Sequence, residues 1–228
     1  MKQLSVHEQL EDFTVVFTEE QTRGKGQLGT EWKANKGKNL TFSVFYNSSF
    51  LALDKQFYLN CAVSVAVFNV LQKLCLPQLY IKWPNDILSG NKKVSGILIE
   101  NIVRSTTEKH SIIGIGLNVN QVAFDESFKA SSLQQILGKH FNLEELLVTL
   151  VVELKRQLQK LRNLDFNELY ESYQAHLFRK NKPSTFKNAE GVMFSGFIKS
   201  VTPEGKLQVL LEDEVIKEFR LKEVKLMY

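Results

Sequence analysis

The stretch that decides the fold is VSGILIENIVRSTTEKHSIIGIGLNV, residues 94–119. Two apolar runs rich in β-branched residues, 94–103 and 111–119, flank the polar segment 104–110. Such a pattern is typical of two strands joined as a β-hairpin. We therefore expect a hairpin here, within a larger sheet to which neighbouring strands are added.

Residues 1–180 combine further strand patterns with helical ones. Strands are predicted at 13–17, 40–46 and 79–82 because β-branched or aromatic residues alternate with polar ones there. Helical periodicity covers four other segments. The segments are 54–74, 132–137, 142–161 and 165–178. Asp54 is the expected N-cap of the first segment, and Gly138 ends the second. The third has a leucine stripe at positions 146, 150, 154, 158 and 161. The predicted fold class is α+β, a mixed β-sheet flanked by helices.

The composition changes at residues 179–183, RKNKP, a charged segment that ends in proline and has no apolar periodicity. We place a domain boundary here, between residues 1–180 and 181–228. Strands are predicted beyond it at 191–201 and 206–211, joined across the turn residues 203–205, and at 215–220 and 224–226. These short strands predict a small β-barrel.

Composition excludes several function classes. The net charge of +4 is spread along 228 residues, so no basic arm or acidic tail marks a docking segment. The two cysteines and four histidines have no metal-ligand spacing, so we expect that the protein holds no metal. We also expect that both cysteines are reduced thiols in the core. The N-terminus lacks a signal-peptide pattern, and no apolar stretch is long enough for a membrane span, so a cytoplasmic enzyme is expected.

The first chemical signal is the glycine-rich loop GKGQLG, residues 24–29. Its glycines let backbone N–H groups approach an anion, and Lys25 adds positive charge. The spacing fits the dinucleotide motif GxGxxG, but that motif must open a helix and precede an acidic residue by about 20 positions. Neither condition is met, and a plain glycine turn is an equally good interpretation of the loop alone.

Three more motifs follow in order: KWPND at 82–86, KVSGILIE at 93–100 and GIGLNVN at 114–120. The first places charged and amide groups at a strand end, and the other two place glycine inside strands, where a ligand often approaches closely. Each also has a plain structural interpretation. These are a turn with Trp83 in the core, a solvated lysine pair before a buried strand, and a strand leading into an asparagine-rich turn.

Together, the order and spacing of the four motifs resemble the catalytic domain of biotin protein ligases. The resemblance covers nearly the whole chain, from residue 21 into the C-terminal strands. It implies a class II synthetase-like catalytic domain with a small SH3-like barrel. The implied enzyme uses ATP and Mg²⁺ to form biotinyl-5'-AMP, and then transfers biotin to a lysine of a biotin carboxyl carrier protein.

The resemblance also implies roles for individual residues. Lys93 matches the family's catalytic lysine, Lys25 would join it in stabilising charge, and Asp86 is a candidate proton acceptor. Residues implied to bind biotin are Gln21, Lys25, Gly26, Gln27, Lys93, Gly96 and Leu98. Residues implied to bind ATP are Gly24, Gly26, Gln27, Trp32, Lys82, Asn85, Asp86 and Asn118, the last against adenine.

The chain departs from the family pattern at two places. The family's loop is usually GRGRxGR, whereas Lys25, Gln27 and Thr30 stand at the three arginine positions here. Lysine does not reproduce the bidentate guanidinium fork, so we expect weaker retention of the adenylate. The family's first strand and its Ser-Thr-Asn segment are not found ahead of the loop, which predicts a start assigned too far downstream or a truncated biotin pocket.

Three alternatives stay open at this point. A lipoate–protein ligase shares the adenylate chemistry, but KWPND followed by GIGLNVN favours biotin. A nucleic-acid-binding module is disfavoured because the aromatic residues fall at core positions and do not interleave with a basic patch. The altered loop also allows a non-catalytic binding protein. No helix-turn-helix precedes the ligase motifs, so DNA binding is not expected, and a homodimer is possible by resemblance.

Overall fold

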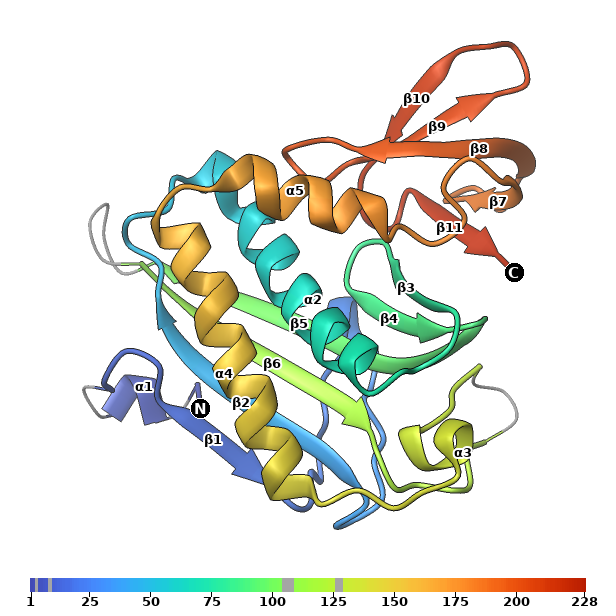
Figure 1. Ribbon diagram of the computed structural model, residues 1–228. Coiled ribbons are helices and arrows are strands. Elements are labelled where there is room, and N and C mark those ends of the chain that lie inside the picture. Colours follow the sequence, from blue (N-terminus) through green and yellow to red (C-terminus); the bar gives the residue numbers. More distant parts are fainter. Residues whose placement is uncertain (3, 8–9, 104–108, 126–128) are drawn as a thin grey trace.

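The computed structural model describes residues 1–2, 4–7, 10–103, 109–125 and 129–228. Its larger layer is a six-stranded sheet with the strand order β1-β2-β6-β5-β4-β3 (Figure 1). The strands are β1 (Val15–Thr18), β2 (Asn39–Asn47), β3 (Leu79–Lys82), β4 (Asp86–Ser89), β5 (Lys92–Val103) and β6 (Lys109–Asn118).

The predicted hairpin is confirmed, because β5 and β6 pair antiparallel from Ser95↔Leu117 to Val103↔Lys109. Residues 104–108 of its polar connection lie outside the described residues. The predicted sheet flanked by helices is likewise present. The strand pairs described within it are antiparallel, and parallel pairing is limited to isolated bridges, including Ile81↔Leu177 and Lys93↔Ala130.

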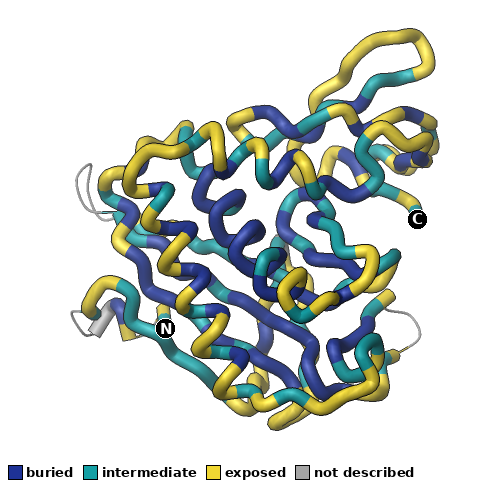
Figure 2. The backbone as a smooth tube through the Cα atoms, viewed as in Figure 1, coloured by how far each residue is buried: buried dark blue, intermediate teal, exposed yellow. Residues whose placement is uncertain are grey.

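Helices cover one face of this sheet (Figure 1). They are α2 (Gln56–Lys73), α4 (Leu143–Arg162) and α5 (Phe166–Ala175), while α1 (Leu4–His7) and α3 (Leu133–Leu137) are short. Helix α2 packs against β3, β4 and β5 and is buried along most of its length, as its nearly continuous apolar sequence predicts (Figure 2). The segment between β1 and β2 crosses the opposite face.

Helix α4 follows its predicted pattern closely. Its N-cap is Asn142, whose side chain accepts hydrogen bonds from the backbone N–H groups of Glu144 and Glu145. The five leucines of the stripe are at most 5% exposed, and the other faces of the helix are largely open to solvent (Figure 2). An amphipathic helix of this kind gains its stability by burying one face on α2 and the sheet.

Several local predictions were wrong. Phe13 has φ 70°, a left-handed conformation that no strand residue adopts, so β1 begins at Val15. Asp54 does not cap α2, because it lies in a 3₁₀ turn and Lys55 is the N-cap. Helix α5 ends at Ala175, before the predicted Phe178. Cys61 is buried and free as expected, whereas Cys75 is exposed.

The C-terminal part forms a second, five-stranded antiparallel sheet in the order β10-β9-β8-β7-β11. Its strands are β7 (Pro183–Asn188), β8 (Met193–Val201), β9 (Leu207–Leu211), β10 (Ile216–Phe219) and β11 (Val224–Met227). The predicted β8–β9 hairpin is confirmed. Among the described strands the end members β10 and β11 do not pair, so no closed barrel is present, although the sheet agrees with an SH3-like fold.

Specific contacts attach this second sheet to the rest of the molecule. The indole Nε1 of Trp83 donates a hydrogen bond to Gly205 O at 2.9 Å, in the β8–β9 turn. From α5, Gln174 Nε2 and the Tyr170 hydroxyl both donate to Val201 O. The boundary at 180/181 stays a prediction. Among the described residues, no helix is long and apolar enough to cross a membrane.

Candidate active site

The site begins as a row of residues across the sheet. The antiparallel register pairs Thr41 with Gly116, Gly116 with Gly96, Gly96 with Asp86, and Asp86 with Lys82. Directly paired residues project to the same face of a sheet. The row therefore brings a carboxylate and an ammonium group, from β4 and β3, to the edge of a floor made of glycine.

Trp32 lies on that glycine floor. A Cβ at Gly116 would be 2.4 Å from Trp32 Cε2, and a Cβ at Gly96 would be 3.3 Å from Trp32 Cζ3. The same Cβ at Gly96 would be 2.9 Å from the Nζ of Lys93. Glycine at position 116 therefore leaves room for the indole, and at position 96 it leaves room for the ammonium group and the ring edge, which is the physical meaning of glycine inside these two motifs.

A cavity of about 610 Å³ opens above this floor. The glycine-rich loop forms one wall, and strands β2, β4, β5 and β6 form the base. Lys25 of the loop and Lys93 of β5 line the same space, as the resemblance requires. The predicted site residues that line the cavity are Gln21, Lys25, Gly26, Gln27, Trp32, Asn85, Asp86, Lys93, Gly96 and Leu98.

Charge is concentrated around Asp86. The Nζ of Lys93 lies 2.5 Å from Asp86 Oδ1, and the Nζ of Lys82 lies 3.5 Å from Asp86 Oδ2. The side chains of Lys93 and Asp86 are 34% and 19% exposed. Lys93 Nζ also lies 5.6 Å from the centroid of the Trp32 ring, a cation–π distance. The carboxylate and the indole together fix the ammonium group at the cavity base.

The glycine-rich loop is closed by its own backbone. Trp32 N donates to Gly24 O at 3.0 Å, and Gly26 N donates to Thr30 O at 2.7 Å. A Cβ at Gly24 would lie 2.1 Å from Trp32 O, so only glycine fits there. The N–H of Gly26 is thus engaged within the loop, whereas the exposed Lys25 side chain faces the cavity.

Three predicted site residues do not line the cavity. Gly24 supports the loop as described. Lys82 reaches Asp86 but lines a second cavity, beside the C-terminal sheet. Asn118 is 3% exposed, and its Nδ2 donates to Ser131 O at 3.0 Å, so in this conformation its amide holds the segment before α3. Its assignment to adenine stays a prediction.

Sequence reasoning missed several cavity residues. Thr41 and Ser43 are polar residues that alternate with apolar ones in the predicted strand 40–46, and this alternation is itself the signal of a second, functional face. Glu100 ends the KVSGILIE motif and lines the cavity four residues beyond Gly96. Leu221 and Lys222 come from the β10–β11 turn of the C-terminal sheet, which no sequence pattern connects with the site.

One buried polar atom in the cavity region lacks a partner among the described residues. The indole Nε1 of Trp32 makes no hydrogen bond there, although buried polar atoms are normally paired. A polar ligand atom would satisfy it. The described residues contain no group of three or more metal-ligating side chains.

Solved structures share this fold. Biotin protein ligase from Aquifex aeolicus, in complex with biotin and ATP, superposes with a TM-score of 0.81 over 99% of this chain and 93% of that one, at 27% identity. A biotin acetyl coenzyme A carboxylase synthetase from Helicobacter pylori, with bound biotinylated ATP, has a TM-score of 0.58 at 20% identity, a likeness of fold alone. The fold is that of the biotin protein ligases.

Relatives identified by sequence similarity are ligases of the same kind as these solved structures. The bifunctional ligase/repressor BirA of Bacillus spizizenii is 28% identical over 212 residues, which is 88% of this chain but 65% of the relative's length. The biotin–[acetyl-CoA-carboxylase] ligase of Paracoccus denitrificans is 27% identical over 88% of both chains. The model of the biotin/lipoate A/B protein ligase family matches residues 2–118, about half of the chain. The chain belongs to the biotin/lipoate A/B protein ligase family.

Proposed function

We propose that the protein is an ATP-dependent biotin protein ligase, which forms biotinyl-5'-AMP and transfers biotin to a lysine of a biotin carboxyl carrier protein. One observation carries the proposal: Lys25 of the glycine-rich loop and Lys93 of β5 line a single cavity over a glycine floor. Family membership and the biotin- and ATP-bound relative from Aquifex support it.

In the first step, a carboxylate oxygen of biotin attacks the α-phosphorus of ATP. A carbon–oxygen–phosphorus anhydride forms, the bond to the β-phosphate breaks, and pyrophosphate leaves with the electron pair. Two anions must approach each other, and charge builds on the leaving group. Fixed cations aimed at that charge stabilise such a transition state, the role assigned to Lys93 and Lys25.

In the second step, the amine of the acceptor lysine attacks the acyl carbon of the adenylate. An amide bond forms, AMP leaves, and the attacking nitrogen loses a proton. Asp86 is the proposed acceptor, but Lys93 and Lys82 both stabilise its negative charge. Its contacts therefore support a second role more strongly, that of holding Lys93 in place.

Mg²⁺ would enter with the nucleotide. In nucleotide enzymes this ion is bound through substrate phosphates, one or two carboxylates and water. Asp86 would supply the protein carboxylate of that donor set only by exchanging a lysine contact for the ion, and its longer contact is the one from Lys82 to Oδ2. The Mg²⁺ requirement, the acceptor protein, the cytoplasmic location and the possible homodimer all stay predictions.

Biotin-dependent ATP–pyrophosphate exchange tests the proposal. We expect exchange with biotin, little exchange with lipoate, and then transfer of label from biotin to a purified carrier domain. Exchange with lipoate but not biotin would establish the alternative ligase of the same family. Tight biotin binding without exchange would establish a non-catalytic binding protein.

A further inference from the structure

The cavity has a second end, which the roles assigned above do not use. There the register pairs Glu100 of β5 with Ile112 of β6, and Ile112 with Phe45 of β2. Both Glu100 and Ile112 line the cavity, and the Glu100 side chain is 35% exposed. Its ion-pair partner is Lys2, whose Nζ lies 3.2 Å from Oε1 of Glu100.

Glu100 lies in line with the reacting groups. Alternate residues of a strand project to one face, so Gly96, Leu98 and Glu100 share the cavity face of β5. The rise of about 3.3 Å per residue places Glu100 about 13 Å from the Gly96 position, where the ammonium of Lys93 lies. The cavity thus has a cation at one end and a carboxylate at the other.

The middle of the cavity floor consists of the small residues Ser43 and Gly114 and the apolar residue Leu98. The register pairs Ser43 with Gly114 and Gly114 with Leu98. A Cβ at Gly114 would lie 3.3 Å from Leu98 O and 3.9 Å from Ser43 Oγ, and with glycine there no side chain rises from the floor between these two residues. The complete surface fits a ligand with an anionic end, an aliphatic middle and a head that donates hydrogen bonds.

We infer that Glu100 is a specificity-determining residue, whose carboxylate accepts a hydrogen bond from an N–H of the cyclic urea of biotin. The inference rests on the proposed function and deepens it. A carboxylate oxygen that accepts from a bound N–H is well compensated, whereas a ligand head without donors covers that oxygen and replaces its water with nothing, even though Lys2 still contacts Oε1. Glu100 therefore selects against the dithiolane of lipoate by the cost of a carboxylate oxygen left without a donor.

The ion pair with Lys2 does not explain this position. Lys2 is 62% exposed, and exposed pairs contribute little to stability. Substitution of each partner separates the ion pair with Lys2 from the acceptance of a hydrogen bond from the ligand. Lys2→Met breaks the ion pair and keeps the carboxylate, whereas Glu100→Leu removes the acceptor and Glu100→Gln keeps one acceptor oxygen in the same shape.

The experiment measures biotin and octanoate binding by calorimetry without ATP, together with KM and kcat in pyrophosphate exchange. For Glu100→Leu we expect biotin affinity to fall about 10-fold to 100-fold, with a matching rise in KM and little change in kcat. Octanoate has no N–H head and should bind no worse. Glu100→Gln should recover part of the loss, and Lys2→Met should bind biotin like the wild type.

Three results would overturn the inference. Unchanged biotin affinity in Glu100→Leu, with an unchanged melting temperature, would reject Glu100 as an acceptor. Equal losses in Lys2→Met and Glu100→Leu would assign the effect to the ion pair. If the wild type neither binds biotin nor exchanges pyrophosphate in its presence, the proposed function fails and the inference fails with it. The wild-type measurement therefore distinguishes the two failures.

Discussion

The ammonium group of Lys93 lies 2.5 Å from the carboxylate of Asp86, although Lys93 is the second residue of the long strand β5 and Asp86 is the first residue of the short strand β4. The register of β4 on β5 brings them together, because Asp86 pairs with Gly96, against whose Cα the Lys93 side chain packs. A lysine held in this way loses little conformational entropy when a carboxylate or phosphate binds.

We expect Lys93→Met to lower the rate of adenylate formation by about 100-fold or more, because it removes a fixed cation from the developing charge. Asp86→Asn should lower it less, since the ammonium stays but is no longer held. Pyrophosphate exchange measures both. Lys92→Met is the matched control, because Lys92 is the exposed neighbour on the same strand and does not line the cavity. An equal loss in that control would contradict the assignment.

Gly116→Ala should force the Trp32 indole off the sheet, since the new Cβ would lie 2.4 Å from the ring. Overpacking of this kind costs about 1–3 kcal/mol, measured as the free energy of unfolding in urea. Gly114→Ala, whose Cβ would meet Leu98 O at 3.3 Å, should cost less. In a Trp32→Ala background, Gly116→Ala should cost little, so that the double variant loses less than the sum of the two single losses; additive losses would show that the two residues do not interact.

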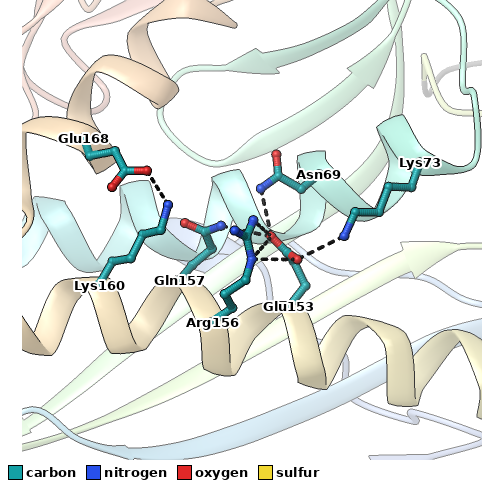
Figure 3. Close-up of polar contacts among 7 residues, drawn as sticks. All are labelled: Asn69, Lys73, Glu153, Arg156, Gln157, Lys160 and Glu168. Carbon is teal, nitrogen blue, oxygen red and sulfur yellow. Dashed lines mark hydrogen bonds and ion pairs between the residues drawn. The ribbon is translucent and has the colours of Figure 1, made fainter.

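The lowered pKa of Glu153 predicts that the protein loses stability in acid. Burial by itself raises the pKa of this carboxyl group, but hydrogen bonds from Arg156, Asn69, Gln157 and Lys73 outweigh it and lower the pKa from 4.5 to about 2 (Figure 3). The folded-state pKa is therefore below the unfolded value. The stabilisation is complete above pH 4.5 and is lost as the pH falls toward 2.

Because this side chain is 5% exposed and joins α4 to α2, Glu153→Gln should lower the free energy of unfolding at pH 7 by about 1.5–3 kcal/mol. The variant should also show a flatter stability profile between pH 5 and 2. Urea unfolding across that range measures both effects. Glu171→Gln, at an exposed position of α5, should leave the profile unchanged. Parallel profiles for wild type and Glu153→Gln would rule out this carboxylate as the source.

The residues of the glycine-rich loop lead to a prediction of how long the protein retains the adenylate intermediate. The double variant Lys25→Arg and Gln27→Arg should release biotinyl-5'-AMP more slowly than the wild type, because guanidinium groups bind phosphate in a bidentate manner. Retention of radiolabelled adenylate during rapid gel filtration measures this. Lys33→Arg, which lies outside the cavity, is the control. Equal retention in wild type and double variant would reject the proposed weak grip of the loop.

The sequence by itself determined what depends on local periodicity. The β5–β6 hairpin, the leucine stripe of α4 and the β8–β9 hairpin each follow from patterns that repeat within a few residues. Through a family resemblance, the order of the four motifs also predicted one common site, and residues of all four motifs line one cavity. The sequence did not reveal β4 and β7, because short strands that begin at a turn or a proline carry too little periodicity.

Only the tertiary structure decided which side chains meet. Trp32 lies on Gly116, 84 positions away in the chain, while Asn118 turns its amide to Ser131 and Glu100 reaches the cavity that Lys93 enters. The C-terminal sheet also stays open between β10 and β11 among the described residues. Such contacts are set by the register between strands distant in sequence and by close packing, and neither leaves a periodic trace in the residues themselves.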